Sequence, residues 1–471
     1  MNADLPADAF GTLPLTAQLL ANLTALGYHS MTPIQARSLP VILDRRDLIA
    51  QAKTGSGKTA AFGIGILQRL NPTWFAVQSL VVCPTRELAD QVANELRRLA
   101  RFADNIKVLT LCGGAPMRPQ IASLEHGAHI VVGTPGRLRD HLGRGSIDLS
   151  TVQTLVLDEA DRMVDMGFYE DIAGIVAACP LRRQTLLFSA TYPADIRRIS
   201  ASFMRDPTEI SVESQHDDSD IEQRFYMIDE AHRYDVVAGI LEAVRPVSTL
   251  AFCNTKLRCR ELAEALCARG YSALALHGDL EQRERDEILV RFVNTSCSVL
   301  VATDVAARGL DITHLNAVIN VDISRDTEVH VHRVGRTGRG ADRGLAITLC
   351  TANEKKWAAL IESYQNKPLT WSEAPLPNTA GGTTLLAPMA TLCIMGGKKD
   401  KVRPADVLGA MTNAAIGLRK DQIGTINVFE FMTYVAVDQA VAKQVSIALG
   451  HGQIKGRSFK VRLVDDLPSH R

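Results

Sequence analysis

A glycine-rich segment near the N-terminus carries the residue types that bind phosphate. Ala52 to Thr59 reads A-K-T-G-S-G-K-T, with Ala52 in place of a first glycine, between a candidate strand at Asp47 to Ala52 and a helical pattern. The backbone N–H groups of such a loop bind phosphate oxygens, its lysine reaches the terminal phosphates and its hydroxyl ligates Mg²⁺. A turn that merely connects strand to helix is the alternative. The predicted nucleotide-binding residues are Thr54, Gly55, Ser56, Gly57, Lys58 and Thr59.

An acidic segment supplies the other groups that phosphoanhydride hydrolysis needs. Asp158 to Asp161 reads D-E-A-D and follows the apolar run T-L-V-L. Asp158 is placed to hold the Mg²⁺ shell and Glu159 to orient the attacking water, because phosphoryl transfer depends mainly on positioning and charge compensation. An acidic run is more often a solvated turn, but the apolar strand before it and the phosphate loop upstream favour the catalytic interpretation.

Short apolar runs alternate with helical patterns along most of the chain. Continuous apolar runs indicate strands buried on both faces, and therefore a parallel sheet covered by helices. The rhythm restarts after Ser211 to Asp220, which predicts two α/β domains in tandem. Ligands bind beyond the carboxyl ends of the strands in such sheets. The runs are Ser79 to Pro84, Ile130 to Pro135, Thr154 to Ala160 and Thr185 to Thr191, then Thr249 to Asn254, Ser272 to Gly278, Ser298 to Asp304, Ala317 to Asp322 and Leu345 to Cys350.

In the order of these motifs the chain resembles the DEAD-box RNA helicases, a family with two RecA-like domains, from Phe10 to about Ser363. The resemblance implies an RNA-dependent ATPase that uses ATP and Mg²⁺. The adenine-reading segment of the family is similar to Gly27 to Gln35, so Gln35 is expected to bond the adenine edge and Phe10 to stack on the base. Tyr28 stands where the family more often has Phe, and we expect little consequence from this difference.

Further segments resemble family motifs that complete the ATPase. Ser189, Ala190 and Thr191 are similar to the motif that couples hydrolysis to domain closure, and Asp161 is assigned to the same coupling. His332 to Arg339 resembles the arginine-finger motif, in which Arg336 and Arg339 are expected to supply positive charge to the transferring phosphoryl group. Asp311, in A-R-G-L-D, is expected by resemblance to contact the ribose.

A second set of matches predicts contacts to the RNA backbone. Their short polar side chains, glycines and guanidinium groups suit phosphate oxygens and 2′-hydroxyls, so no base recognition is expected there. By resemblance, domain closure clamps and bends one strand and thereby separates a short duplex. The matched residues are Pro84, Thr85, Arg86, Gly114, Thr134, Pro135 and Arg137 in the first domain, and Gln282, Arg285 and Thr303 in the second.

Met389 to Val464 has the predicted element order β-α-β-β-α-β, which is typical of the RNA-recognition-motif fold. The first strand has Cys393 where that fold stacks bases, and on the third strand only Tyr434 is aptly placed, which argues against base stacking across the sheet. The segment resembles the RNA-binding domain of DbpA-type helicases, which implies binding of a large-subunit ribosomal RNA hairpin and a role in large-subunit assembly. The candidate contacts are Lys398, Lys399, Lys401, Arg403, Lys455 and Arg457, with Lys460 and Arg462.

The expected fold class is therefore α/β, with two tandem RecA-like parallel-sheet domains followed by a small α+β RNA-recognition-motif-like domain. Polar, Pro-rich and Gly-rich stretches place the boundaries. The predicted division is 1–210 for the first RecA-like domain, 211–220 for a linker, 221–365 for the second RecA-like domain, 366–387 for a second linker and 388–471 for the RNA-binding domain.

Composition limits the cellular compartments and the classes of binding partner that we expect. The 52 basic and 52 acidic residues cancel, which excludes a uniformly basic coat, yet the chain from Ala387 onward has 12 Lys and Arg against 7 Asp and Glu, or +5. Nine cysteines without a C-x-x-C pair indicate a reducing compartment and no zinc. No apolar run reaches the ~18 residues of a membrane span. We expect a cytoplasmic protein with RNA and a pre-ribosomal particle as partners, and no membrane.

Two other functions use similar motifs. An ATP-gated RNA clamp, or a general RNA chaperone acting on other structured RNA, would need the same residues as a helicase. A DNA helicase or translocase is a third possibility, but the Gln35 segment and D-E-A-D argue against it.

Overall fold

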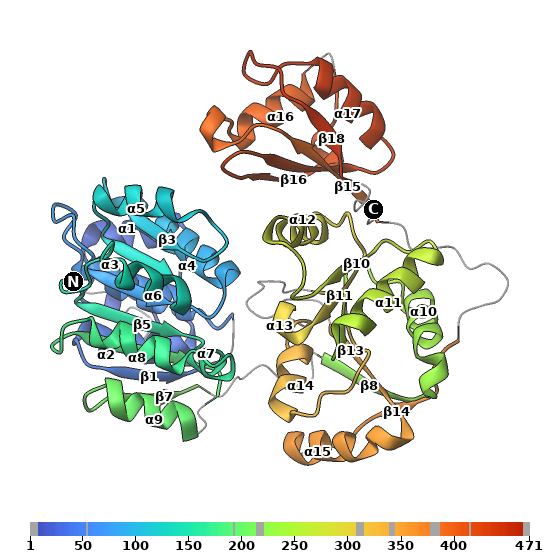
Figure 1. Cartoon of the computed structure of the whole chain (residues 1–471), viewed down its shortest axis with the longest axis horizontal. Coiled ribbons are helices and arrows are strands. Elements are labelled where there is room, and N and C mark those ends of the chain that lie inside the picture. Colours follow the sequence, from blue (N-terminus) through green and yellow to red (C-terminus); the bar gives the residue numbers. More distant parts are fainter. Residues whose placement is uncertain are drawn as a thin grey trace. The chain divides into compact units, whose positions relative to one another are not determined.

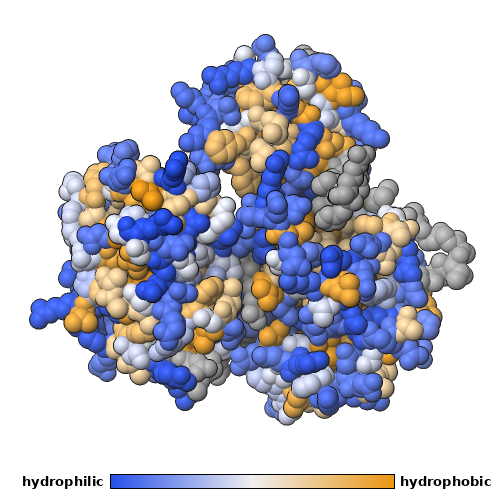
Figure 2. Space-filling view, in the orientation of Figure 1, coloured by the Kyte–Doolittle hydropathy of each residue, from blue (hydrophilic) through white to orange (hydrophobic). Residues whose placement is uncertain are grey.

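The computed structural model describes residues 8–52, 55–191, 194–212, 221–307, 315–338, 344–376, 387–413 and 416–464. The chain divides into two compact units, the first built on one seven-stranded sheet and the second on another seven-stranded sheet and a four-stranded sheet (Figure 1). On the face shown in Figure 2 hydrophilic side chains dominate and hydrophobic ones gather only in small patches. None of the helices described is long and apolar enough to cross a bilayer.

The first unit is a parallel sheet covered by helices on both faces. Successive residues of one strand enter different cores: Leu155 and Leu157 pack in one hydrophobic cluster and Val156 in the other. This is the pattern of a strand buried on both sides. In sheet order the strands are β3 (Val108–Leu111), β4 (Ile130–Gly133), β2 (Ser79–Val82), β5 (Thr154–Asp158), β6 (Gln184–Ser189), β1 (Leu48–Gln51) and β7 (Thr208–Ser211). The helices are α1 (Ala17–Ala25), α2 (Pro33–Leu43), α3 (Lys58–Arg69), α4 (Arg86–Leu99), α5 (Met117–Glu125), α6 (Pro135–Gly143), α7 (Ala160–Asp165), α8 (Tyr169–Ala177) and α9 (Ala194–Phe203).

The strand order of this sheet sorts the predicted motifs into two groups. The phosphate loop, D-E-A-D and S-A-T follow β1, β5 and β6, which are neighbours in the sheet. The predicted RNA motifs follow β2, β3 and β4, which are also neighbours. Because all these strands are parallel, both groups lie at the carboxyl edge of one sheet.

The second unit begins with a sheet of the same kind. Its strands are also paired in parallel, and its order places strands β10 and β11 where the first sheet has β3 and β4. The strands are β10 (Ala273–Leu276), β11 (Val299–Thr303), β9 (Thr249–Cys253), β12 (Ala317–Asn320), β13 (Gly344–Cys350), β8 (Ile221–Met227) and β14 (Trp371–Ser372). The helices are α10 (Arg233–Val244), α11 (Lys256–Ala268), α12 (Gln282–Val293), α13 (Asp304–Ala307), α14 (Thr327–Val334) and α15 (Lys355–Gln365).

The C-terminal part is a four-stranded antiparallel sheet with two helices. Its strand order, β16-β17-β15-β18, and the positions of its helices agree with the predicted β-α-β-β-α-β order. The elements are β15 (Met389–Ile394), α16 (Pro404–Thr412), β16 (Ile423–Val428), β17 (Thr433–Asp438), α17 (Ala442–His451) and β18 (Val461–Leu463). Two RecA-like parallel sheets and a small α+β domain confirm the predicted fold class.

The predicted second linker contributes one strand that the sequence pattern did not indicate. Trp371 and Ser372, inside the segment 366–387, pair with Phe225 and Tyr226 of β8. The ring centroids of Trp371 and Phe225 are 5.6 Å apart, which gives this short edge strand a hydrophobic anchor. The second sheet therefore extends into the segment predicted as a linker, whereas most of the first linker, 211–220, lies outside the described residues.

A buried guanidinium group holds the carboxyl edge of the second sheet together. Arg333, on α14, donates to both carboxylate oxygens of Asp304 at 2.7 and 2.6 Å, to Asn254 Oδ1 at 2.9 Å and to the carbonyl of Asp322 at 2.7 Å. These three acceptors follow β11, β9 and β12. The Arg333 side chain is 2% exposed, so its bonds cannot be replaced by water without opening the structure.

Replacing Arg333 by Met should therefore destabilise the fold by about 3 kcal/mol, since the Asp304 carboxylate would lose a buried partner. Denaturant unfolding of the full chain measures the change. As a control, Arg224→Met removes an ion pair to Glu222 that is open to solvent, and it should cost less than about 1 kcal/mol. Equal effects of the two substitutions would show that Arg333 does not organise this edge.

Candidate functional site

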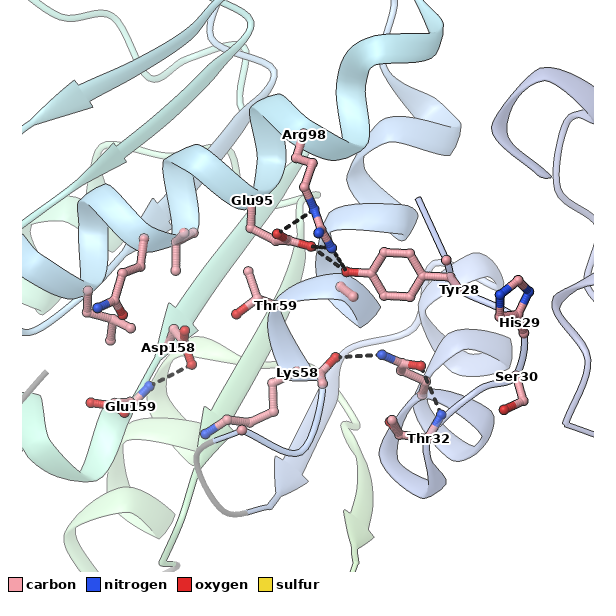
Figure 3. Close-up of a pocket in the computed structure, with 18 residues that line it drawn as sticks. Tyr28, His29, Ser30, Thr32, Lys58, Thr59, Glu95, Arg98, Asp158 and Glu159 are labelled. Atoms are coloured by element: carbon pink, nitrogen blue, oxygen red, sulfur yellow. Dashed lines mark hydrogen bonds and ion pairs between the residues drawn. The ribbon is translucent and has the colours of Figure 1, made fainter. Parts of the chain in front are cut away.

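A pocket of about 580 Å³ lies at the carboxyl edge of the first sheet. Its walls come from the phosphate loop with the start of α3, the segment Gly27 to Gln35, one face of α4, and the turn after β5 (Figure 3). The pocket brings together Gln35, Gly55, Gly57, Lys58, Thr59, Asp158 and Glu159 of the predicted nucleotide-site residues.

Two glycines give the phosphate loop its shape. Gly55 and Gly57 have φ angles of +81° and +97°, in the left-handed region that side chains disfavour. A Cβ atom on Gly57 would also lie 2.5 Å from Gln35 Nε2 and 2.9 Å from Thr32 Oγ1. Gly57 is the N-cap residue of α3, so the loop turns directly into a helix N-terminus, which favours bound anions.

The ammonium group of Lys58 is buried and has no hydrogen-bond acceptor among the described residues. A buried charge without an acceptor is costly, and this one lies in the wall of an open pocket. Its position fits the terminal phosphates of a nucleotide, which would supply the missing acceptors.

The D-E-A-D segment turns sharply between β5 and α7. Glu159 has a left-handed backbone (φ +53°), and its N–H donates to Asp158 Oδ1 at 3.0 Å. Glu159 Oε2 also lies 3.2 Å from Arg162 Nη1. The carboxylates of Asp158 and Glu159 are both buried, and these contacts hold them in place. Burial raises the pKa of Asp158 to about 6, an effect that the nearby Lys58 opposes and Glu159 reinforces. A bound cation would remove this penalty on the charged form.

The last residue of D-E-A-D connects the two motifs on neighbouring strands. Asp161 Oδ2 accepts hydrogen bonds from the backbone N–H groups of Ala190 and Thr191, both at 3.0 Å, and from Thr191 Oγ1 at 3.1 Å. Ser189 is the last residue of β6 and is buried. The predicted coupling residues are thus joined directly to the hydrolytic motif.

Two aromatic residues, Tyr28 within the adenine-reading segment and Phe10 before it, lie in different surroundings. Gln35 donates to the carbonyl of Gly57 at 3.1 Å and accepts from Thr32 N–H at 2.9 Å, so it ties this segment to the phosphate loop. Phe10 is buried in the core, edge-on to Tyr28 at 6.2 Å, and is not among the residues that line the pocket. Tyr28 lines it instead and forms hydrogen bonds through its hydroxyl, so its difference from Phe has a structural consequence after all.

Three of the predicted nucleotide-site residues, Thr54, Asp311 and Arg339, lie outside the described residues. Ser56 lies in the phosphate loop but not in the pocket lining. Arg336 follows α14, has a buried side chain, and accepts through its carbonyl from Leu315 N–H at 3.4 Å. Arg333, three residues earlier, was not singled out by the sequence, although its buried bonds anchor this segment.

Two of the predicted RNA-binding residues of the first unit, Arg86 and Arg137, lie against the loop after β3. The Arg86 guanidinium lies against Gly113 and Gly114, so a Cβ on Gly114 (φ +74°) would overlap it. Arg137 donates to the carbonyl of Ala115 and to Gln120 Oε1, both at 2.9 Å. Thr85 caps α4 by accepting from Leu88 N–H at 3.3 Å, and Pro84 precedes it. Thr134 and Pro135 are the N-cap and first residues of α6.

The matching residues of the second unit lie around helix α12. Gln282 begins this helix and donates to Asp286 Oδ1 at 2.8 Å. Arg285, one turn later, donates to the carbonyl of Ala306 in α13 at 2.5 Å. Thr303 ends β11, the strand that leads into α13. The three residues thus belong to two adjacent carboxyl-edge segments, β10 to α12 and β11 to α13.

The basic residues of the C-terminal part come together from two distant segments. Lys455 Nζ donates to the carbonyl of Lys401 at 3.3 Å and lies 3.9 Å from Asp406 Oδ2. This contact places segment 455–457 beside segment 398–403. The side chains of Lys398, Lys399, Lys401, Arg403, Lys455, Arg457, Lys460 and Arg462 are all exposed. Arg462 is paired with Glu287 at 2.6 Å, and Lys399 with Glu430 at 3.2 Å.

The four-stranded sheet does not offer the aromatic platform of its fold type. Tyr434 and Cys393 are buried, in one cluster with Val464 and with Val290 of α12. Two exposed rings lie nearby: Phe429 and Phe431 are 41% and 64% exposed, and the carbonyl of Phe429 accepts from Lys398 N–H at 2.8 Å. Their only signal was an aromatic pair two residues apart after a strand. A groove of about 700 Å³ also includes Phe459, Lys460 and Arg462.

Three protein-family models match successive parts of the chain. The model of the DEAD/DEAH box helicase family matches residues 32–199, the helicase conserved C-terminal domain matches residues 232–341, and the DbpA RNA binding domain matches residues 391–463.

Similar proteins and structures match from about three quarters to nearly all of the chain. The chain is 52% identical over 457 residues to the ATP-dependent RNA helicase DbpA of Escherichia coli, covering 97% of this chain and 99% of that protein. It is 45% identical over 346 residues to the DEAD-box ATP-dependent RNA helicase CshA of Geobacillus kaustophilus, covering 73% and 74%. The structure of Saccharomyces cerevisiae Dbp5 bound to RNA and ADP BeF3 matches 78% of this chain and 96% of its own, with 29% identity and a TM-score of 0.71.

One relative thus covers nearly the whole chain, and the family models cover the phosphate loop, the acidic turn after β5 and the antiparallel C-terminal sheet. The chain belongs to the DEAD-box ATP-dependent RNA helicases of the DbpA type, which are RNA-dependent ATPases with a C-terminal RNA-binding domain.

Proposed function

We propose that this helicase locally unwinds or remodels ribosomal RNA during assembly of the large ribosomal subunit, and that its C-terminal domain selects the RNA. The observation that carries the proposal is the joining of two basic segments at one place on that domain by the contact between Lys455 and Lys401. The match to the DbpA RNA binding domain supports it. A cytoplasmic location, and the domain limits 1–210, 221–365 and 388–471, belong to the same proposal.

In the proposed mechanism the first unit binds ATP with Mg²⁺. The loop from Thr54 to Gly57 would surround the phosphates with N–H groups, and Lys58 would neutralise the terminal ones. Thr59 and Asp158 would hold Mg²⁺, which neutralises charge on the phosphates when bound. Gln35 would read the adenine edge, and Glu159 would orient the attacking water. The Lys58 ammonium, which has no acceptor among the described residues, and the raised pKa of Asp158 both suit a bound nucleotide with its cation.

The second unit is proposed to complete the site only when the two RecA-like units close on ATP and RNA. Arg336 and Arg339 would then stabilise the charge of the transferring phosphoryl group, and Asp311 would contact the ribose. Because hydrolysis needs these arginines, turnover would depend on closure. Asp161, bonded to Ala190 and Thr191, would transmit the state of the phosphate site to S-A-T.

The RNA backbone is proposed to cross the carboxyl edges of both sheets. Arg86, Arg137 and the loop at Gly114 would contact one stretch of phosphates, and Gln282, Arg285 and Thr303 another. These groups cannot distinguish bases, so selectivity would come from the C-terminal basic segments and the exposed Phe429 and Phe431 beside them.

Lys58→Ala should lower RNA-stimulated ATP hydrolysis by about 10²- to 10³-fold, because it removes a preorganised charge from the phosphate site. The fold should survive, since the ammonium lies in a pocket wall rather than the hydrophobic core. Steady-state phosphate release measures the rate, and Lys356→Ala, an exposed lysine beside Trp357, serves as control. Turnover near that of the wild type would refute the phosphate-loop assignment.

Arg336→Ala should lower the rate constant of hydrolysis by roughly 10³- to 10⁵-fold while ATP affinity changes only a few-fold, as expected of an arginine finger. Single-turnover kinetics and equilibrium nucleotide binding separate the two quantities. Arg325→Ala, on the exposed segment before α14, should alter neither. If rate and affinity of Arg336→Ala fell by the same factor, Arg336 would act in ground-state binding.

The ribosomal substrate is tested by comparing ATPase stimulation by a large-subunit ribosomal RNA fragment and by unrelated RNA of equal length. The wild type should need at least about tenfold less of the ribosomal fragment, because only RNA whose fold places its phosphates opposite the basic segments engages several of them together. The full-length double variant Lys398→Gln, Lys455→Gln should lose this preference, and the slope of log affinity against log salt should flatten by about 0.7 to 1.4.

A matched control removes two charges elsewhere on the same domain, by Lys420→Gln and Lys443→Gln. Because both lysines lie outside segments 398–403 and 455–457, the preference should persist. A wild type without preference would refute the ribosomal substrate, and equal effects of both double variants would refute the basic segments as the selecting surface.

A further inference from the structure

The hydroxyl group of Tyr28 is bound to two side chains of helix α4. It donates a hydrogen bond to Glu95 Oε1 and accepts one from Arg98 Nη2 at 2.8 Å. Arg98 and Glu95 are themselves paired at 3.1 Å, and the Arg98 guanidinium lies 5.3 Å from the centre of the Tyr28 ring. Figure 3 shows the Tyr28 side chain reaching from its loop to these two residues. A Phe at this position could form neither hydrogen bond.

The hydroxyl group remains a donor at every pH in ordinary use. Burial, followed by the hydrogen bond and charge of Glu95, raises the pKa of Tyr28 to about 12. A protonated hydroxyl beside a carboxylate makes a charge-assisted hydrogen bond, which is stronger than one between neutral groups. The loop and the helix are therefore joined by a directional contact as well as by packing.

Helix α4 connects this contact with the proposed RNA site. Leu88, Gln91, Val92, Glu95 and Arg98 line the nucleotide pocket and recur every three or four residues, so one face of the helix forms a pocket wall. At its N-terminal end, Arg86 lies against Gly113 and Gly114. The 14 residues of α4 span roughly 20 Å as a continuous helix.

The segment that carries Tyr28 is also attached to the phosphate loop. Gln35 bonds the carbonyl of Gly57, and Thr32 N–H bonds Gln35. A nucleotide that fills the pocket therefore contacts a loop with two attachments, one to the phosphate loop and one, through Tyr28, to α4. A displacement of this loop would be passed to both.

We propose that Tyr28 is a positioning residue that couples nucleotide binding to RNA binding through helix α4. The proposal rests on the proposed function, in which the pocket binds ATP and Arg86 belongs to the RNA track. Occupation of the pocket fixes Tyr28, its hydroxyl fixes Glu95 and Arg98, and the helix fixes Arg86 against the glycine loop. By linkage, RNA binding then strengthens nucleotide binding by the same factor.

The test measures this coupling factor, the ratio of RNA affinities with and without a non-hydrolysable ATP analogue. Fluorescence anisotropy of a labelled single-stranded RNA gives both affinities for the full-length wild type, Tyr28→Phe, Glu95→Gln and the double variant. Tyr28→Phe should lower the coupling factor by roughly 3- to 10-fold. The double variant should lose no more than the larger single loss, since both changes weaken the same connection.

Tyr271→Phe is the matched control, because the Tyr271 hydroxyl bonds the carbonyl of Ala238 at 3.4 Å in the second unit and Tyr271 does not line this pocket. It should leave the coupling factor unchanged, which separates coupling from the general loss of a buried hydroxyl. If Tyr28→Phe and Glu95→Gln both kept the coupling factor of the wild type, this proposal would be wrong while the proposed function would stand. A wild type whose RNA affinity does not respond to the analogue would overturn it together with the proposed function.

Discussion

The burial of parallel strands on both faces is the constraint on which the rest of this structure depends. A strand such as β5, with every residue buried, carries polar residues only at its two ends, Thr154 and Asp158. Polar chemistry must therefore begin where the strand ends, and parallel pairing brings all such ends to one edge. Strand order alone then decides which motifs become neighbours. In the first sheet it places the phosphate loop, D-E-A-D and S-A-T on adjacent strands, and the proposed RNA motifs on the next three.

This constraint also explains how much of the fold could be predicted. The runs at Ser79, Ile130 and Thr154 are continuous and apolar, and each contains a strand of the structure. The outermost strands carry weaker patterns. In β7, Thr208–Ser211, residues alternate between partly buried and exposed, and β14 has only two residues. A sheet edge needs less apolar surface, so its strands differ little from loops in sequence.

The candidate site also has a part that could be predicted from the sequence and a part that could not. Residue types and spacing were sufficient to predict that Lys58, Asp158 and Glu159 lie in one pocket, because each belongs to a local loop or turn at the end of a strand. Contacts across the chain were not predictable. The burial of Phe10 behind the pocket, the bonds of Tyr28 to a helix 67 residues away in sequence, and the joining of Lys401 to Lys455 all depend on tertiary packing. Arg333 was missed because a buried structural arginine has no signal of its own inside an arginine-rich motif.

The contact between Gln35 and Gly57 has a consequence for how the enzyme can distinguish nucleotides. The amide of Gln35 occupies the space that a side chain at position 57 would need, so Gln35, proposed to read the base, and the phosphate loop cannot move independently. Discrimination against a wrong base is then not confined to the base itself. A guanine that displaced Gln35 would also displace the phosphate loop. A wrong base would then weaken phosphate binding as well as base binding.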